Sequence, residues 1–244
     1  MDTLAQVIGY SVLTAAATGL GVIPLAFSKA IPTRLMSLAG ALASGLLLAV
    51  AFDLLHEGMR ARPATAILGI VAGLALISTG RKWLEKRAAP EIGRLADAGM
   101  LDAVILIGVM TIHSFPEGMA IGLALGKGLH FGFLISLAIA LHNIPEGLAV
   151  GLVLVPKGMS PWKAGLWSVF TSLPQPLVAV PAFLLVSSFE PLLPFGLGLA
   201  AGAMIWMIGA EVLPEACGKA TPASIGAALT LGVALMLAIQ ALAG

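Results

Sequence analysis

The chain is dominated by apolar stretches long enough to cross a membrane, and this pattern constrains its fold more than any other feature. A transmembrane helix needs roughly 20 predominantly apolar residues. Eight stretches meet that need, near residues 4–27, 35–56, 64–80, 101–125, 131–155, 164–186, 192–213 and 222–243. Only 10% of the residues are charged, whereas soluble domains have about 25%. We therefore predict an all-α integral membrane protein with eight transmembrane helices.

The connections between these stretches are short, so the chain has no room for a separate soluble domain. We treat residues 1–244 as a single transmembrane domain. One longer polar stretch, residues 81–99, could form a cytosolic loop or a short amphipathic helix. Cys217 is the single cysteine, which excludes an intramolecular disulfide and a CxxC metal or redox motif.

The basic residues predict the orientation of the chain in its membrane. Ten of the 13 Lys and Arg residues lie in or beside the first, third, fifth and seventh connections, and the others are Arg60, Arg62 and Lys127. Short cytoplasmic loops carry an excess of Lys and Arg. We therefore predict a multi-pass protein of the cell (inner) membrane with both termini outside the cytoplasm. Nucleic acid is not an expected partner, because the basic residues are few and sit in short loops.

A short motif occurs twice, each time inside an apolar stretch. HSFPEG begins at His113, and HNIPEG begins 29 residues later at His142. Each copy places a His four residues before a Glu, which on a helix puts both side chains on one face, one turn apart. Imidazole nitrogen and carboxylate oxygen together bind borderline divalent cations such as Zn(II). We therefore predict a metal site near mid-membrane, formed by His113, Glu117, His142 and Glu146.

The acidic residues of the apolar stretches support a cationic ligand. Six lie within or at the ends of these stretches, and no Lys or Arg lies in a stretch interior; the six are Asp53, Glu57, Glu117, Glu146, Glu211 and Glu215. A carboxylate in this position costs several kcal/mol unless it is paired or protonated. We therefore expect the counter-charge to come from outside the chain, as a metal ion or a proton. For any single Glu the alternative is a protonated side chain that hydrogen-bonds between helices.

A proline separates the His from the Glu in both copies of the motif. Pro116 and Pro145 have no N–H and press against the carbonyl one turn back. We expect the carbonyls of Ile112 and Leu141 to lose their helical partners and to face a ligand or water. A helix break at mid-membrane is typical of transporter sites.

HSFPEG and HNIPEG, in the adjacent fourth and fifth of eight helices, resemble the motifs of the ZIP (Zrt/Irt-like) family of divalent metal transporters, particularly its prokaryotic GufA-like branch. The resemblance implies that the two His/Glu pairs form the primary transport site. It also implies that Ser114 and Asn143 can line an adjacent second metal site. Gln175 stands where prokaryotic relatives often carry a Glu, and the missing negative charge argues against a binuclear centre. The resemblance further implies that one helix bundle slides or rocks against another.

A weaker internal similarity links the second and seventh predicted helices. DLLHEG begins at Asp53, and EVLPEA begins at Glu211. Because these helices run in opposite directions in the predicted topology, the similarity predicts an inverted repeat of helices 1–3 and 6–8 around helices 4 and 5. Asp53, His56 and Glu57 could collect cations at the outer mouth, and Glu211 and Glu215 could pass them to the cytoplasm. Helix-end acids that are simply solvated are the alternative.

Together these features predict a transporter that moves divalent metal into the cytoplasm, with zinc first and iron, manganese, cobalt or cadmium as further candidates. Two positive charges that enter an inside-negative compartment gain about 4.6 kcal/mol per 100 mV, twice the single-charge value, so no nucleotide is needed. An intramembrane metal-dependent hydrolase is one alternative, weakened by the lack of HExxH, and a metal channel that uses the same residues is another. We expect no enzyme activity and no cofactor. The expected partners are metal ions and lipid, and a homodimer is left open.

Overall fold

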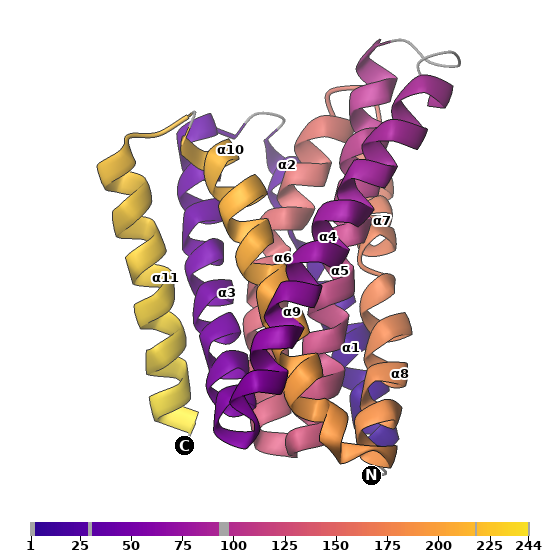
Figure 1. Cartoon of the computed structure of the whole chain (residues 1–244). Coiled ribbons are helices and arrows are strands. Elements are labelled where there is room, and N and C mark those ends of the chain that lie inside the picture. The colour runs from indigo at the N-terminus through magenta and orange to yellow at the C-terminus, as the bar shows by residue number, and fades with distance from the viewer. Residues whose placement is uncertain (1–2, 29–30, 93–97, 218, 244) are drawn as a thin grey trace.

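The apolar stretches form antiparallel helices in the computed structural model of the chain (Figure 1). The structure describes residues 3–28, 31–92, 98–217 and 219–243. Within these residues eight helical spans are long and apolar enough to cross a membrane, which confirms the predicted number. The spans are Thr3–Phe27, Thr33–Ala61, Pro63–Trp83, Leu106–Lys127, Leu129–Leu154, Pro161–Ser188, Glu190–Val212 and Pro222–Leu242.

Five spans are parts of unbroken helices, and three are interrupted. The unbroken helices are α3 (Thr33–Ala61), α4 (Pro63–Ile92), α5 (Ala98–Lys127), α6 (Leu129–Leu154) and α11 (Pro222–Ala243). The interrupted spans consist of α1 (Thr3–Leu20) with α2 (Ile23–Phe27), of α7 (Pro161–Thr171) with α8 (Pro174–Ser188), and of η1 (Glu190–Leu192), α9 (Leu193–Met207) and η2 (Ile208–Val212). The short helix α10 (Leu213–Cys217) follows directly after the last of these spans. The element η2 is a π-helical turn.

The interruptions do not fall where the sequence predicts them. Helices α5 and α6 continue through Pro116 and Pro145, so the predicted breaks at these prolines are wrong. The chain breaks instead at Gly21 and Val22, before Pro24, and at Ser172 and Leu173, before Pro174. A proline in the first turn of a helix loses nothing through its missing N–H, so both prolines are well placed to start the second segment.

The polar stretch after the third span is largely helical. Residues 81–92 continue α4, and residues 98–99 begin α5. Residues 93–97 lie outside the described part of the chain. Figure 1 shows that this pair of helices extends beyond the rest of the bundle.

Close backbone contacts at glycines divide the helices into two groups. A Cβ atom added to Gly147 would overlap the carbonyl oxygen of Thr18, and one added to Gly118 would lie 2.5 Å from the carbonyl oxygen of Gln175. In the same way α3 meets α11 at Gly45, and α4 meets α9 at Gly198. Among the described glycines, each such contact with the backbone of another helix joins members of the same group. The first helix group is α1, α2, α5, α6, α7 and α8, and the second helix group is α3, α4, α9, η2, α10 and α11.

The pairing of helices has the symmetry that the predicted inverted repeat requires. Span three packs along span seven, and span eight packs along span two. Likewise span four packs along span six, and span five packs along span one. In an inverted repeat, spans one, two and three correspond to spans six, seven and eight, and span four corresponds to span five. This exchange turns the pair of spans three and seven into the pair eight and two, and the pair four and six into the pair five and one. The helix packing therefore agrees with the repeat.

The two ends of the bundle differ in charge. The first residue of α1 and the last residue of α11 lie at one end, which we call the termini end (Figure 1). The other end, which we call the basic end, carries Arg34 and Lys163 in the first turns of α3 and α7, and Lys157 and Lys219 in connections. By the positive-inside rule the basic end is predicted to face the cytoplasm.

Candidate metal centre

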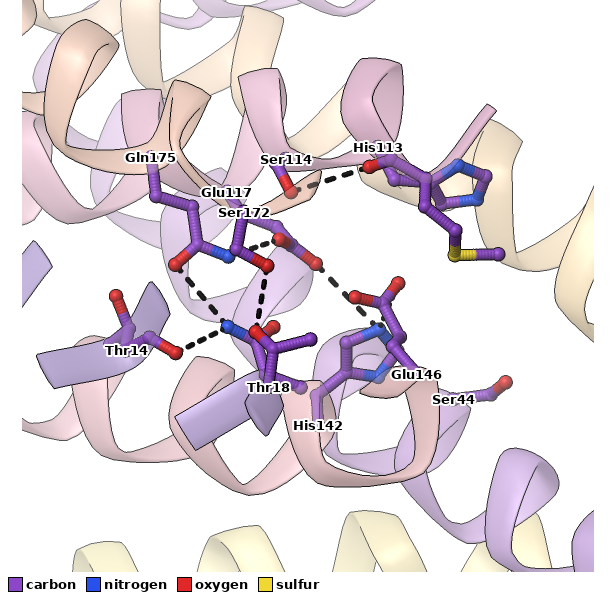
Figure 2. Close-up of polar contacts among 12 residues, drawn as sticks. Thr14, Thr18, Ser44, His113, Ser114, Glu117, His142, Glu146, Ser172 and Gln175 are labelled. Atoms are coloured by element: carbon purple, nitrogen blue, oxygen red, sulfur yellow. Dashed lines mark hydrogen bonds and ion pairs between the residues drawn. The ribbon is translucent and has the colours of Figure 1, made fainter. Parts of the chain in front are cut away.

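Three predicted ligands converge between the two helices that carry the repeated motif. Glu117 comes from α5, and His142 and Glu146 come from α6; one ligand atom of each lies within 4.8 Å of the others. His142 Nε2 lies 3.2 Å from Glu146 Oε1 and 3.6 Å from Glu117 Oε1. Figure 2 shows the three side chains pointing toward one another. We call this set the central cluster.

The central cluster is buried at the middle of its helices, and several of its ligand atoms are not hydrogen-bonded. Glu117 is fully buried, and the side chain of Glu146 is only 10% exposed. Among the described residues, Glu117 Oε1, His142 Nε2 and Glu146 Oε1 have no hydrogen-bond partner. Buried polar atoms are normally hydrogen-bonded, so such orphans need an explanation. A divalent cation between two carboxylates and an imidazole would satisfy all three and suits Zn(II).

The fourth predicted ligand, His113, is turned away from the central cluster. Its Nε2 lies 2.6 Å from Oε2 of Glu211 on η2, and its Nδ1 lies 2.9 Å from the carbonyl oxygen of Val109. Figure 2 shows the imidazole ring pointing away from the side chains of Glu117 and His142. The two motifs have the same internal spacing, yet only the copy on α6 brings its His and Glu together.

Two of the residues predicted beside a second metal site, Asn143 and Gln175, form a hydrogen-bonded chain next to the central cluster. Gln175 Nε2 donates to Glu117 Oε2 at 2.7 Å, and Asn143 Nδ2 donates to Gln175 Oε1 at 3.2 Å and to the carbonyl oxygen of Thr14 at 2.8 Å. Ser114 donates to the carbonyl oxygen of Met110 within its own helix. Gln175 and Asn143 are fully buried. This chain fixes one oxygen of Glu117 and leaves the other for the central cluster (Figure 2).

A buried hydroxyl pair next to this chain is absent from the sequence prediction. Thr18 Oγ1 and Ser172 Oγ lie 2.7 Å apart and link the end of α1 to the break between α7 and α8. Both residues are buried. The sequence signal is the spacing of Ser11, Thr14 and Thr18, which places three hydroxyls on one face of an apolar helix.

A cavity of about 670 Å³ leads from the central cluster toward the basic end. His142 and Glu146 line its deep part, and Thr33, Arg81 and Lys219 line its outer part. On the termini side of the cluster, large side chains from α3, α5 and α6 pack against one another, including the fully buried Leu47, Leu54, Ile121, Ile135 and Ile139. The structure is therefore open to the basic end and closed to the termini end.

The predicted access-path residues have partners that the sequence does not reveal. Glu57 forms an ion pair with Lys127, and Asp53 accepts a hydrogen bond from Gln240. Glu211 forms an ion pair with Arg81 at 2.6 Å. For Glu57 and Glu211 the expectation of a counter-charge from outside the chain is thus wrong, because long basic side chains near the ends of membrane spans reach these acids.

Two further access-path residues remain predictions. His56 is exposed near the termini end of α3. Glu215 belongs to α10, but its side chain lies outside the described residues.

Comparison with known proteins gives a consistent set of relatives. The sequence model of the ZIP zinc transporter family matches residues 84–240. A protein of Arabidopsis thaliana that is provisionally named a zinc transporter is 44% identical over 236 residues, which cover 96% of this chain and 38% of that protein. The zinc transporter ZIPB of Bordetella bronchiseptica is 35% identical over 263 residues, which cover 97% of this chain and 82% of that protein. The zinc transporter GufA of Myxococcus xanthus is 39% identical over 114 residues, which cover 46% of this chain and 45% of GufA. The chain therefore spans less than half of the Arabidopsis relative and most of ZIPB.

Proposed function

The chain belongs to the ZIP zinc transporter family, and from this premise we propose that it carries divalent metal, zinc first, into the cytoplasm through the central cluster. The observation that carries the proposal is the position of Glu117, His142 and Glu146. They are buried at mid-helix, and each has a buried polar atom without a hydrogen-bond partner among the described residues. His142 and Glu146 line the inner end of the cavity. Membership of a transporter family favours transport over the alternative of a metal-dependent hydrolase.

The charge of the central cluster suits a divalent cargo. Two carboxylates neutralise one dication, so a loaded site is close to neutral and can cross a low-dielectric region at modest cost. An inside-negative membrane favours inward movement by about 4.6 kcal/mol per 100 mV for two charges, twice the single-charge value. Iron, manganese, cobalt and cadmium are further candidate substrates, because the same ligand types bind them.

The closed side of the site supports a carrier rather than a channel. A channel needs a path that is open to both sides at once. Here the cavity reaches the basic end, and the core between the cluster and the termini end includes the fully buried side chains of Leu54, Ile121 and Ile135. The two helix groups would have to move against each other for the cluster to face the other side. In this proposal the basic end faces the cytoplasm.

Zinc uptake into proteoliposomes with a set inside-negative potential tests the proposal. We expect Glu117→Ala and Glu146→Ala to reduce uptake at least about a hundredfold, because each removes a charged ligand of a buried dication. Glu190→Ala is the matched control, since Glu190 is exposed in η1 outside the cavity. Near-normal uptake by both cluster variants, with the protein folded and inserted, would remove the central cluster from the proposal. Saturation of the rate with external zinc would support the carrier over the channel.

A further inference from the structure

Glu211 contacts His113, the one predicted metal ligand that is not part of the central cluster. His113 Nδ1 contacts the carbonyl oxygen of Val109, and a carbonyl can only accept, so Nδ1 donates this hydrogen bond. Nε2 is the nitrogen left to bind a metal, because the partner of one ring nitrogen decides what the other can do. Glu211 Oε2 lies 2.6 Å from this Nε2. Glu211 and a metal ion would therefore compete for the same atom.

Arg81 fixes Glu211 in the position from which it reaches His113. The Arg81 guanidinium contacts the other carboxylate oxygen of Glu211 at 2.6 Å and lies over the Trp206 ring, 5.9 Å from its centroid. The side chain of Glu211 is only 11% exposed, so both of its contacts are partly shielded from solvent. Glu211 also lies in the π-helical turn η2, a feature that is frequent at functional sites.

The contact between His113 and Glu211 joins the two helix groups. His113 belongs to the first group, whereas Glu211 and Arg81 belong to the second. The central cluster and Gln175 lie entirely in the first group. A movement of one group against the other would therefore carry the cluster as a unit but would change the contact of His113.

We propose that Glu211, held by Arg81, is a positioning residue that removes His113 from the metal when the cavity is open to the basic end. With this ligand withdrawn, the metal keeps only Glu117, His142 and Glu146 and leaves more readily. When the two helix groups move apart at this contact, His113 Nε2 becomes free to bind the metal. The metal then has four ligands, namely His113 and the three residues of the central cluster. The inference rests on the proposed function and adds a residue that promotes release.

Zinc affinity of the full chain in lipid nanodiscs, measured by calorimetry, tests this role without any transport step. Glu211→Gln removes the charge that attracts His113, so His113 can join the metal, and we expect zinc to bind about tenfold more tightly. His113→Ala should change the affinity of the wild type little, but it should cancel most of the gain in the Glu211→Gln background. A purely structural role of Glu211 would not produce this dependence on His113.

A second variant and a second readout complete the test. Glu211→Asp keeps the charge and the Arg81 partner but withdraws the carboxylate from His113, so it should give a smaller gain in affinity. It also serves if Glu211→Gln fails to fold. In zinc uptake, Glu211→Gln should lower the maximal rate and the KM together, because release is slowed while binding is tightened.

Two results would overturn the inference. Weaker zinc binding in both Glu211 variants would make Glu211 itself a metal ligand, and unchanged binding would leave it without a role at the site. A wild-type chain that binds zinc but does not transport it would count against the proposed function and leave the binding test of Glu211 intact.

Discussion

The side-chain amide of Gln175 donates a hydrogen bond of 2.7 Å to Glu117 Oε2. The other amide atom, Oε1, accepts from Asn143 Nδ2 at 3.2 Å, so the Gln175 side chain is fixed at both ends. The amide thus supplies a neutral hydrogen-bond donor on the side of Glu117 that faces away from His142. A cation on that side would have to displace this hydrogen bond.

We expect the wild-type chain to hold one zinc ion tightly and any second ion much more weakly. Two dications a few ångströms apart repel strongly at low effective dielectric, and two carboxylates offset only about half of their four charges. Gln175→Glu adds a carboxylate beside Glu117 and should strengthen a second binding event without displacing the first. Calorimetric stoichiometry on the purified protein measures both events.

Gln6→Glu is the matched control for this charge, because Gln6 lies on α1 two turns from Thr14. It should leave the stoichiometry at one. Two ions of similar high affinity in the wild type would show that neutral oxygens and water are sufficient for a second site.

The parts of the structure that the sequence predicts depend on short-range patterns. The eight spans follow from the length of the apolar stretches, since a helix must satisfy its backbone inside the bilayer. The contact of His142 with Glu146 follows from their four-residue spacing on one helix. Glu117 joins them because α5 and α6 are antiparallel neighbours with their motifs at the same depth.

The parts that the sequence does not predict depend on contacts between distant segments. His113 has the same spacing to Glu117 as His142 has to Glu146, but it faces η2, where Glu211 offers a nearer partner at 2.6 Å. Glu211 in turn meets Arg81, which is 130 residues away in the sequence. No helical periodicity encodes such a contact, because it depends on how α4, α5 and η2 pack.

Gly147→Ala should destabilise the first helix group. The new Cβ would overlap the carbonyl oxygen of Thr18, so α1 and α6 would have to separate. Overpacking of this kind typically costs about 1–3 kcal/mol of unfolding free energy. Gly9→Ala on α1 is the matched control, because no atom of the described residues lies within 4 Å of the added Cβ. Thermal denaturation in detergent should show a lower midpoint for Gly147→Ala alone, and equal midpoints would contradict the close approach of the two backbones.

Thr18→Val tests the buried hydroxyl pair between α1 and the break before α8. Valine keeps the shape of threonine but leaves the Ser172 hydroxyl without its partner at 2.7 Å. Hydrogen bonds between membrane helices contribute about 0.6 kcal/mol on average and up to about 1.7 kcal/mol, so we expect a loss of about 1 kcal/mol in the free energy of unfolding. Thr230→Val is the control, because the Thr230 hydroxyl is exposed and donates to the carbonyl oxygen of Gly226 in its own helix. An equal loss in both variants would mean that the Thr18–Ser172 bond adds nothing.

Glu57 and Lys127 form an ion pair at the termini end, and their substitution is expected to change the KM for zinc in opposite directions. If Glu57 concentrates cations at an outer mouth, Glu57→Gln should raise the KM for zinc two- to threefold with little change in the maximal rate. Lys127→Gln removes the positive charge that offsets Glu57, so it should lower the KM.

Zinc uptake at low and high ionic strength measures both effects, and both should shrink at high salt because exposed charges are screened over about 10 Å at 0.1 M. The side chains of Lys127 and Glu57 are 38% and 21% exposed, so salt can reach this pair. A pair that only braces α3 against α5 would be lost in either variant. Both variants would then change the maximal rate in the same direction, and the attraction of cations by Glu57 would have to be abandoned.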